Sequence, residues 1–380
     1  MSGRWKAGQG TADTWWAALK AALDDLAAMP PEANLGLVYV DQAIADDLSS
    51  IVTFLRETTP IGQWGGCVGF GVLGPQGFAQ DGAAVVLLVG CVAEDAVRLF
   101  DGFDPNDAEP FWADHGRWLK DQDQVVAVLA HGDANQPRVA QMVHALAEQA
   151  SAYVVGGLTA PGSGPRQVAG KALGGGLSGF LLGDGISLLT GLSQGCHPIG
   201  PLHRISEAVE NVVMALDGLP ALDVMKSEVG DLIARDLQRA HGYIHVALPQ
   251  EGSDDPHAYQ VRSLMAVDPK RGWLAIGQKV LSGQSLMFVR RDPASARVDL
   301  QRMLERLVSR LAGQKIAAGV YVSCVARGAQ MFGEPDGEAE MIKRVLGDFP
   351  LVGFAAAGEI CHDRLYGYTG VLCLFLEDAP

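Results

Sequence analysis

The 380-residue chain has few charged residues, and basic residues are scarce among them. Charged side chains make up 19% of the sequence against 48% hydrophobic ones, and 29 Lys and Arg stand against 44 Asp and Glu, a formal net charge of −15. Low charge combined with high hydrophobicity excludes an intrinsically disordered chain. The shortage of basic residues argues against a nucleic-acid partner, because contacts to phosphates need a basic face.

Long apolar runs and paired cysteines are missing as well. No uncharged apolar stretch approaches the ~18 residues of a membrane span, and the first residues hold no apolar signal core, so we expect a cytoplasmic protein with no membrane partner. Six cysteines without C-x-x-C spacing predict neither a disulfide scaffold nor a structural zinc site. His241 and His245 lie four apart near an expected strand that offers no further ligand, so we expect no metal site there.

Glycine, in contrast, is abundant and unevenly spread. Its 47 residues are roughly 12% of the chain, against a usual share of about 7%. They recur in a unit made of an apolar strand, a helix, a second strand with glycines, a loop and a long apolar strand, which indicates an internal repeat. The three copies run from Leu35–Asp41 through Ile61–Gly69 to Ala83–Val89, from Val125–Leu129 through Ala152–Gly157 to Leu177–Leu182, and from Gly319–Cys324 through Pro350–Phe354 to Gly370–Phe375.

The repeat and its flanking helices predict the fold class. Apolar residues at helical spacing predict a helix inside the later copies and another over Pro293–Leu311, whose stripe includes Leu300 and Leu307. The strands are almost continuously apolar, which is typical of strands covered on both faces. We therefore expect an α/β (α+β) protein of two lobes, in which repeated strand–helix–strand units form mixed β-sheets with helices packed on them. Residues 184–210 contain two prolines and predict an inter-lobe connection, so we divide the chain into residues 1–190 and 191–380.

The sequence contains fragments of catalytic motifs, but none in its required context. Residues 69–74 and 174–179 fit G-x-G-x-x-G, yet a turn or a strand follows each of them instead of the helix that a dinucleotide site needs. Residues 191–195 fit G-x-S-x-G, but Pro198 and Pro201 disfavour the helix that must follow a nucleophilic serine. We therefore predict a protein that is not an enzyme.

Two clusters of polar residues remain as candidate sites. Cys196 and His197 lie next to each other near the expected lobe boundary, where they are either a packed thiol with a loop imidazole, or an activated thiolate, or an axial ligand to haem iron. In the C-terminal part, Cys324 and Arg327 follow one strand and Glu359 follows another. Arg327 and Glu359 either recognise a small polar ligand or form a buried salt bridge between two loops.

Several of these segments together resemble one family, the FIST proteins (F-box and intracellular signal transduction proteins). The resemblance covers nearly the whole chain. It rests on Gln194–Pro201, Glu210-Asn211 and Leu216–Leu222 at the junction, on Tyr321–Gly328, Met331–Glu334, Pro350–Phe354 and Ala357–Ile360 in the C-terminal part, and on Val155–Thr159 in the N-terminal part.

The resemblance implies an N-terminal FIST domain in residues 1–190 and a C-terminal FIST domain in residues 191–380, which together form a ligand-sensing module. The family is regarded as binding small ligands, with amino acids as a proposed class, and one bacterial subgroup binds haem, responds to nitric oxide and acts on a separate histidine kinase. The chain leaves no room for an output domain, so we expect it to signal through a partner protein. The ligand-binding residues that we predict are Cys196, His197, Asn211, Cys324, Arg327 and Glu359, with His197 as an axial ligand if haem is the cofactor.

Three functions therefore stay open at this point. The first is a cytoplasmic sensory module that binds haem or an amino-acid-like metabolite between its two lobes and signals through a partner. The second is a cysteine-dependent enzyme that uses Cys196, Cys324 or Cys361 as its nucleophile. The third is an adaptor that binds no ligand.

Overall fold

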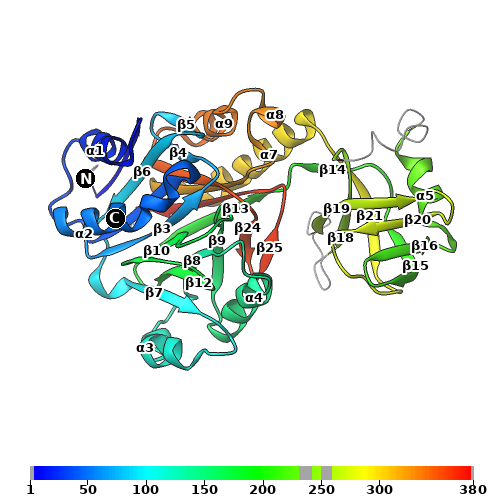
Figure 1. The fold of residues 1–380 in the computed structure, drawn as a ribbon, viewed down its shortest axis with the longest axis horizontal. Helices are drawn as coiled ribbons and strands as arrows, with labels where there is room; N and C mark the ends of the chain where they lie inside the picture. The colour runs from blue at the N-terminus through cyan, green and yellow to red at the C-terminus, as the bar shows by residue number, and fades with distance from the viewer. Residues whose placement is uncertain (1–3, 231–241, 250–258, 378–380) are drawn as a thin grey trace. The chain divides into compact units, whose positions relative to one another are not determined.

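A computed structural model describes residues 4–230, 242–249 and 259–377 (Figure 1). Two compact units make up the chain: unit 1 comprises Met1–Ser193 and Leu300–Pro380, and unit 2 comprises Gln194–Asp299. Unit 1 is therefore built from both ends of the sequence, and unit 2 lies between them along the chain. The division at residue 190 stays a prediction about the two FIST domains.

Unit 1 confirms the internal repeat. In each copy the first strand runs parallel to the second and antiparallel to the third, so that the first strand lies between the other two. The strands, in the order first, second and third, are β2 (Leu35–Asp41), β3 (Gln63–Gly69) and β6 (Ala83–Gly90); β8 (Ala127–Gly132), β9 (Tyr153–Leu158) and β12 (Leu177–Leu182); and β22 (Ile316–Cys324), β23 (Leu351–Ala356) and β26 (Gly370–Leu376).

The copies exchange hairpins in a cycle. The hairpin of the first copy extends the sheet of the third, that of the second copy extends the sheet of the first, and that of the third copy extends the sheet of the second. In each sheet one further strand pairs with the third strand and forms the edge opposite the hairpin, so each of the three sheets has six strands. The hairpins are β4 (Val72–Gly74) with β5 (Gly77–Ala79), β10 (Gln167–Ala169) with β11 (Ala172–Leu173), and β24 (Glu359–His362) with β25 (Arg364–Tyr366); the edge strands are β1 (Trp5–Ala12), β7 (Val97–Phe103) and β13 (Leu188–Ser193).

One glycine in each second strand explains part of the glycine excess. Gly66, Gly156 and Gly353 occupy the same register in the three copies. A Cβ atom on any of them would lie 1.8–1.9 Å from the backbone oxygen of the opposite residue in the first strand. A side chain would therefore push the two central strands of the sheet apart.

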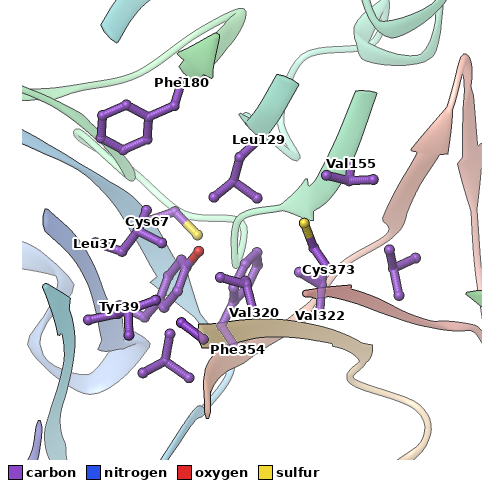
Figure 2. Close-up of a cluster of buried hydrophobic side chains, with 14 of the residues drawn as sticks. Leu37, Tyr39, Cys67, Leu129, Val155, Phe180, Val320, Val322, Phe354 and Cys373 are labelled. Atoms are coloured by element: carbon purple, nitrogen blue, oxygen red, sulfur yellow. The ribbon is translucent and has the colours of Figure 1, made fainter. Parts of the chain in front are cut away.

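The core of unit 1 lies where the three sheets face one another. Side chains from all three copies form one buried cluster there, which Figure 2 shows in close-up. Tyr39 of the first copy, Phe180 of the second and Phe354 of the third are each at most 1% exposed. The strands are buried on both faces, as their continuous apolar runs predict, because helices cover the faces that point away from this core.

Each copy has at least one helix between its first and second strands, and further helices of the described chain lie outside the copies. The longest is α7 (Pro293–Leu311), which has the predicted bounds, and its apolar stripe, including Leu300 and Leu307, is buried. No helix within the described ranges is long and apolar enough to cross a membrane. The part of α7 from Leu300 onward belongs to unit 1. The other helices of unit 1 are α1 (Trp15–Asp25), η1 (Gln42–Asp47), α2 (Leu48–Thr58), η2 (Glu94–Ala96), α3 (Glu109–Lys120), α4 (Val139–Gln149), α8 (Gly328–Phe332) and α9 (Gly337–Leu346).

Unit 2 is an antiparallel barrel. Its strands β15 (His203–Val209), β16 (Val212–Leu216), β20 (Trp273–Ile276), β19 (Tyr259–Asp268), β18 (Ile244–Pro249) and β21 (Ser285–Arg291) pair in this order, and β21 closes the ring by pairing with β15. Two short strands and one helix complete the unit: β14 (Cys196–Pro198), β17 (Leu219–Pro220) and α5 (Ala221–Glu228).

The chain passes from unit 1 to unit 2 between Ser193 and Gln194, inside the segment predicted to connect two lobes. Residues 184–210 also contribute β13, β14 and β15. Pro198 is the last residue of β14, Gly200 and Pro201 lie in the gap between β14 and β15, and strand pairing with distant segments forms on both sides of this gap. The wider prediction of mixed sheets with packed helices in two lobes is confirmed.

Candidate ligand pocket

A cavity of about 90 Å³ lies in unit 1, at the point where the hairpin of the first copy meets the sheet of the third. The β4–β5 hairpin forms one side of it, and α8 and α9 form another. Figure 1 shows where these elements lie in the fold. Its volume exceeds the ~30 Å³ that one water occupies and is smaller than an engineered cavity of about 150 Å³ that accepts benzene. The apolar part of the lining includes Leu73, Phe78, Phe354 and Ala355, and the polar part includes Tyr321, Ser323, Cys324 and Glu338.

Glu338 organises the polar side of this cavity. Its Oε1 accepts hydrogen bonds from the Tyr321 hydroxyl at 2.6 Å and from Arg327 Nε at 2.7 Å, and its Oε2 accepts one from the Ser323 hydroxyl at 2.6 Å. The residue is only 7% exposed. Three donors, one of them a cation, compensate the desolvation of this carboxylate.

Arg327 is held from several sides. It is 1% exposed, and its guanidinium lies over the Phe332 ring, 5.0 Å from the centroid. Its Nη1 donates to the backbone oxygens of Ser193 and Tyr368 at 3.4 and 3.3 Å, and its Nη2 donates to the Ser193 hydroxyl at 3.2 Å. Arg327 is therefore a fixed part of the scaffold that holds Glu338 in place.

Glu359 and Cys324 lie next to this network. Glu359 is fully buried, and its Oε2 accepts hydrogen bonds from the Thr369 backbone at 3.0 Å and hydroxyl at 2.7 Å. Burial raises the pKa of Glu359 to about 8, although Thr369, Arg327 and Cys324 act in the opposite direction. Burial, and then the neighbouring Glu359, raises the pKa of the Cys324 thiol to about 12. Both groups therefore hold their protons at neutral pH.

The β4–β5 hairpin is tied to the start of α9. The Phe78 backbone N–H donates to the Asp336 carboxylate, the residue that precedes α9. A Cβ atom on Gly77 would lie 2.7 Å from the same carboxylate, and the φ of Gly77 is +101°, so only glycine fits this approach. The wall of the cavity that comes from the first copy is thus bonded to the helix that carries Glu338.

The corresponding places in the other two copies are apolar. The three first strands can be aligned on the residue that lies opposite the glycine of the second strand, which is Val38, Ala130 or Tyr321. Two residues later the same strands have Val40, Gly132 and Ser323. In the first sheet, Val38 and Val40 pack in a hydrophobic cluster with Ile51 of α2 and Val168 of the inserted hairpin, and in the second sheet Ala130 packs with Met142 of α4 and Ile360 of the hairpin. Hydroxyl and carboxylate groups replace this packing only in the third sheet.

The structure divides the predicted site residues between the units. Cys324, Arg327 and Glu359 come together in unit 1, as their positions after neighbouring strands predict. The carboxylate bonded to Arg327 is Glu338, which the sequence analysis missed together with Tyr321 and Ser323. A signal was present in the sequence, because Tyr321 and Ser323 are alternate residues of an otherwise apolar strand and therefore share one face.

The other predicted residues belong to unit 2. Cys196 is buried and His197 exposed on β14, where His197 lies opposite Arg290 of β21. The Asn211 side chain donates to the backbone oxygen of Ile276 at 2.9 Å. His245 is buried on β18, whereas His241 lies outside the described residues. No group of three or more potential metal ligands occurs within the described ranges.

The environment of two candidate nucleophiles disfavours thiolate chemistry. A nucleophilic cysteine needs a lowered pKa. Burial instead raises the pKa of both Cys324 and Cys361. Cys361 is also in contact with the Tyr153 hydroxyl at 3.4 Å, while its neighbour His362 is exposed, so the two side chains of this pair do not face each other.

The cavity in unit 1 does not fit haem. Its lining contains no histidine, its only thiol is protonated at neutral pH, and a volume of about 90 Å³ is much smaller than the macrocycle. His197 remains the predicted iron ligand, since its exposed imidazole in unit 2 is accessible. No chemistry that depends on haem follows from the cavity.

Comparison with known proteins identifies the family. A FIST N domain matches residues 34–219 and a FIST C domain matches residues 221–362. An uncharacterised protein of Mycobacterium tuberculosis is 35% identical over 200 residues, and one of Mycobacterium bovis is 34% identical over 201 residues; each match covers 49% of this chain and 50% of the relative. The chain thus spans about half the length of the curated relatives it matches. FIST domains are sensor domains of signal-transduction proteins and bind small ligands. The two matches together span residues 34–362 almost without a gap, and the chain belongs to the FIST family.

Proposed function

We propose that this chain is a sensory module whose small ligand binds in the cavity beside Tyr321, Ser323 and Glu338. The observation that carries the proposal is the difference between three equivalent places. Two of them are filled by apolar side chains from a strand, a helix and a hairpin, and the third is hollow and lined by a buried carboxylate and hydroxyl groups. A polar cavity at this place lowers the stability of the folded state, because burying polar groups contributes less free energy than packing apolar side chains. A bound ligand offsets that cost.

The lining indicates the chemistry of the ligand. A carboxylate has about four lone-pair positions, and Glu338 uses three of them for Tyr321, Ser323 and Arg327. One position on Oε2 is left for a donor group, and apolar walls from Leu73 and Phe78 suit a small apolar body. The ligand class is therefore a small molecule with an amine or hydroxyl donor, and an amino-acid-like metabolite carries such a donor in its ammonium group.

The hairpin supplies a route from the cavity to a partner. A ligand between Phe78 and Glu338 contacts both elements that the Phe78–Asp336 hydrogen bond joins. Its binding then favours the arrangement of β4–β5 and α9 in which that bond is formed. A separate signalling protein, such as a histidine kinase, reads this arrangement.

Thermal shift with a panel of small amines, alcohols and amino acids tests the proposal. A ligand that prefers the folded state raises its stability by about 2.7 kcal/mol at a concentration of 100 Kd. The variant Ala339→Leu fills the cavity and leaves the Glu338 hydrogen bonds in place, so it should abolish the shift. The control is Ala140→Leu, an exposed helical alanine of the second copy, which should keep the shift. A hit that stabilises Ala339→Leu as strongly as the wild type would contradict the assignment.

A further inference from the structure

The second copy breaks the repeat in another way, at the loop between its second strand and its hairpin. Two residues join β3 to β4 in the first copy and β23 to β24 in the third. In the second copy, residues 159–166 join β9 to the start of β10. This segment contains two glycines and two prolines and ends at Arg166.

Arg166 is a largely buried cation that forms no ion pair with any residue in the described ranges. The residue is 8% exposed, and its Nε is buried and makes no hydrogen bond to any described residue. No carboxylate among the described residues lies within 4.0 Å of its guanidinium, in contrast to Arg327, which binds Glu338. The Nε–H group is a buried donor without an acceptor, which is costly, and a partner from solution that bonds to the guanidinium would offset that cost.

The surroundings hold Arg166 in place. Its backbone N–H donates to Leu173 and its backbone oxygen accepts from Val68, both at 2.9 Å, so the residue is fixed in the first sheet. A Cβ atom on Gly162 would lie 2.2 Å from Arg166 Nη2, which means that the guanidinium lies directly against the loop backbone. The Asn135 side chain donates to the backbone oxygen of Gly162 at 2.8 Å and braces the loop from the other side.

An acidic residue of this region, Asp133, bonds to backbone groups. The Asp133 carboxylate accepts hydrogen bonds from the backbone N–H groups of Asn135 and Gly175, each at 2.8 Å. These bonds fasten the turn after β8 to the β11–β12 segment. Asp133 therefore caps these two turns, and within the described residues it forms no ion pair with Arg166, whose guanidinium is left for another acceptor.

We propose that the loop 159–166 and Arg166 form a binding site for a small oxyanion, separate from the cavity beside Glu338. The chemistry is that of a planar guanidinium, which binds carboxylate or phosphate oxygens through two parallel hydrogen bonds. Since the whole chain carries a net charge of −15, general electrostatic attraction does not collect anions, and local geometry selects this one.

Thermal shift and calorimetric titration with inorganic phosphate and with acetate test the proposal, against sodium chloride at equal ionic strength. Either anion should raise the melting temperature of the wild type by about 2 °C or more beyond chloride. The larger response identifies the phosphate or the carboxylate as the preferred oxyanion.

Substitutions assign the effect to Arg166. Arg166→Met should lose the anion response, and without added anion it should melt no lower than the wild type, because an uncompensated cation is gone. Arg166→Lys keeps the positive charge but loses the two parallel N–H donors of the guanidinium, so it should weaken the response to the anion. The control Arg138→Met removes a half-exposed arginine of the same copy and should leave the response unchanged.

Two results would overturn the site. One is a wild type that responds to phosphate and acetate no more than to chloride. The other is an anion response that survives in Arg166→Met. If Arg166→Met does not fold, Gly162→Ala, which displaces the guanidinium, serves as the second variant and must lose the response.

Discussion

Glu359 should make the stability of unit 1 depend on pH in an unusual direction. Its carboxyl group is fully buried, and burial raises its pKa from 4.5 to about 8. Between these two values the folded protein holds a proton that the unfolded chain has lost. A raised pKa in the folded state means that stability is complete below pH 4.5 and falls as the pH rises toward 8.

The expected magnitude follows from the size of the shift. One pKa unit corresponds to about 1.4 kcal/mol, so the free energy of unfolding loses about 3.5 kcal/mol between pH 5 and pH 8 through this one residue. Glu359→Gln removes the titration while its amide oxygen still accepts from Thr369. The difference in unfolding free energy between the wild type and Glu359→Gln should therefore change by about this amount, in favour of the variant at pH 8.

Urea unfolding followed by tryptophan fluorescence at pH 5 and pH 8 measures this difference. Comparing each variant with the wild type at the same pH cancels the other titrating groups. The control is Glu57→Gln, an exposed carboxylate on α2 for which no ion pair occurs among the described residues, and its difference from the wild type should not change between pH 5 and pH 8. If the difference for Glu359→Gln changes by less than about 1 kcal/mol, Glu359 is not a protonated buried acid and our reasoning is refuted.

Two further predictions concern the repeat and the cofactor. Gly353→Ala should lower the free energy of unfolding by about 3 kcal/mol or more, because its Cβ would lie 1.9 Å from the Tyr321 backbone oxygen. The control Gly62→Ala, with open space around it, should change that free energy by less than about 0.5 kcal/mol. Equal losses for the two variants in chemical denaturation would contradict the packing argument. If haem binds through His197, hemin added to the protein should give a sharp Soret band that His197→Ala shifts or abolishes and that His144→Ala, another exposed histidine, leaves unchanged. A broad band of loosely bound hemin in the wild type would end the haem prediction.

Local signals explain why the repeat was predictable from the sequence. Continuous apolar strands such as Ala83–Val89, the glycines of the second strands and the stripe of α7 are all set by residues close together in the chain. These signals predicted the strand–helix–strand units and their mixed pairing. The strands β14 and β15 were not predicted, because the prolines and glycine beside them are strong local turn signals, while both strands pair with β21, about 80 to 95 residues away.

The site was predictable only in part, for the same reason. Cys324, Arg327 and Glu359 lie close together, as their positions at or after neighbouring strand ends predict, although only Cys324 lines the cavity and their role in binding stays a prediction. The partner of Arg327 was not found, because Glu338 reads as an ordinary first-turn carboxylate of an amphipathic helix. Arg166 carried no local signal at all, since its burial and its lack of a carboxylate are properties of the folded loop.

The sequence by itself determined that unit 1 contains three similar strand–helix–strand units, since side-chain periodicity and glycine positions are local properties. Only the tertiary structure decided that the hairpin of each copy pairs with the sheet of another copy. Such pairing depends on closing long loops rather than on neighbouring residues. That exchange places Leu73 and Phe78 of the first copy over Tyr321 and Glu338 of the third. The hollow exists because the third copy has polar groups where the other two pack apolar side chains, and this contrast appears only once the copies are folded together.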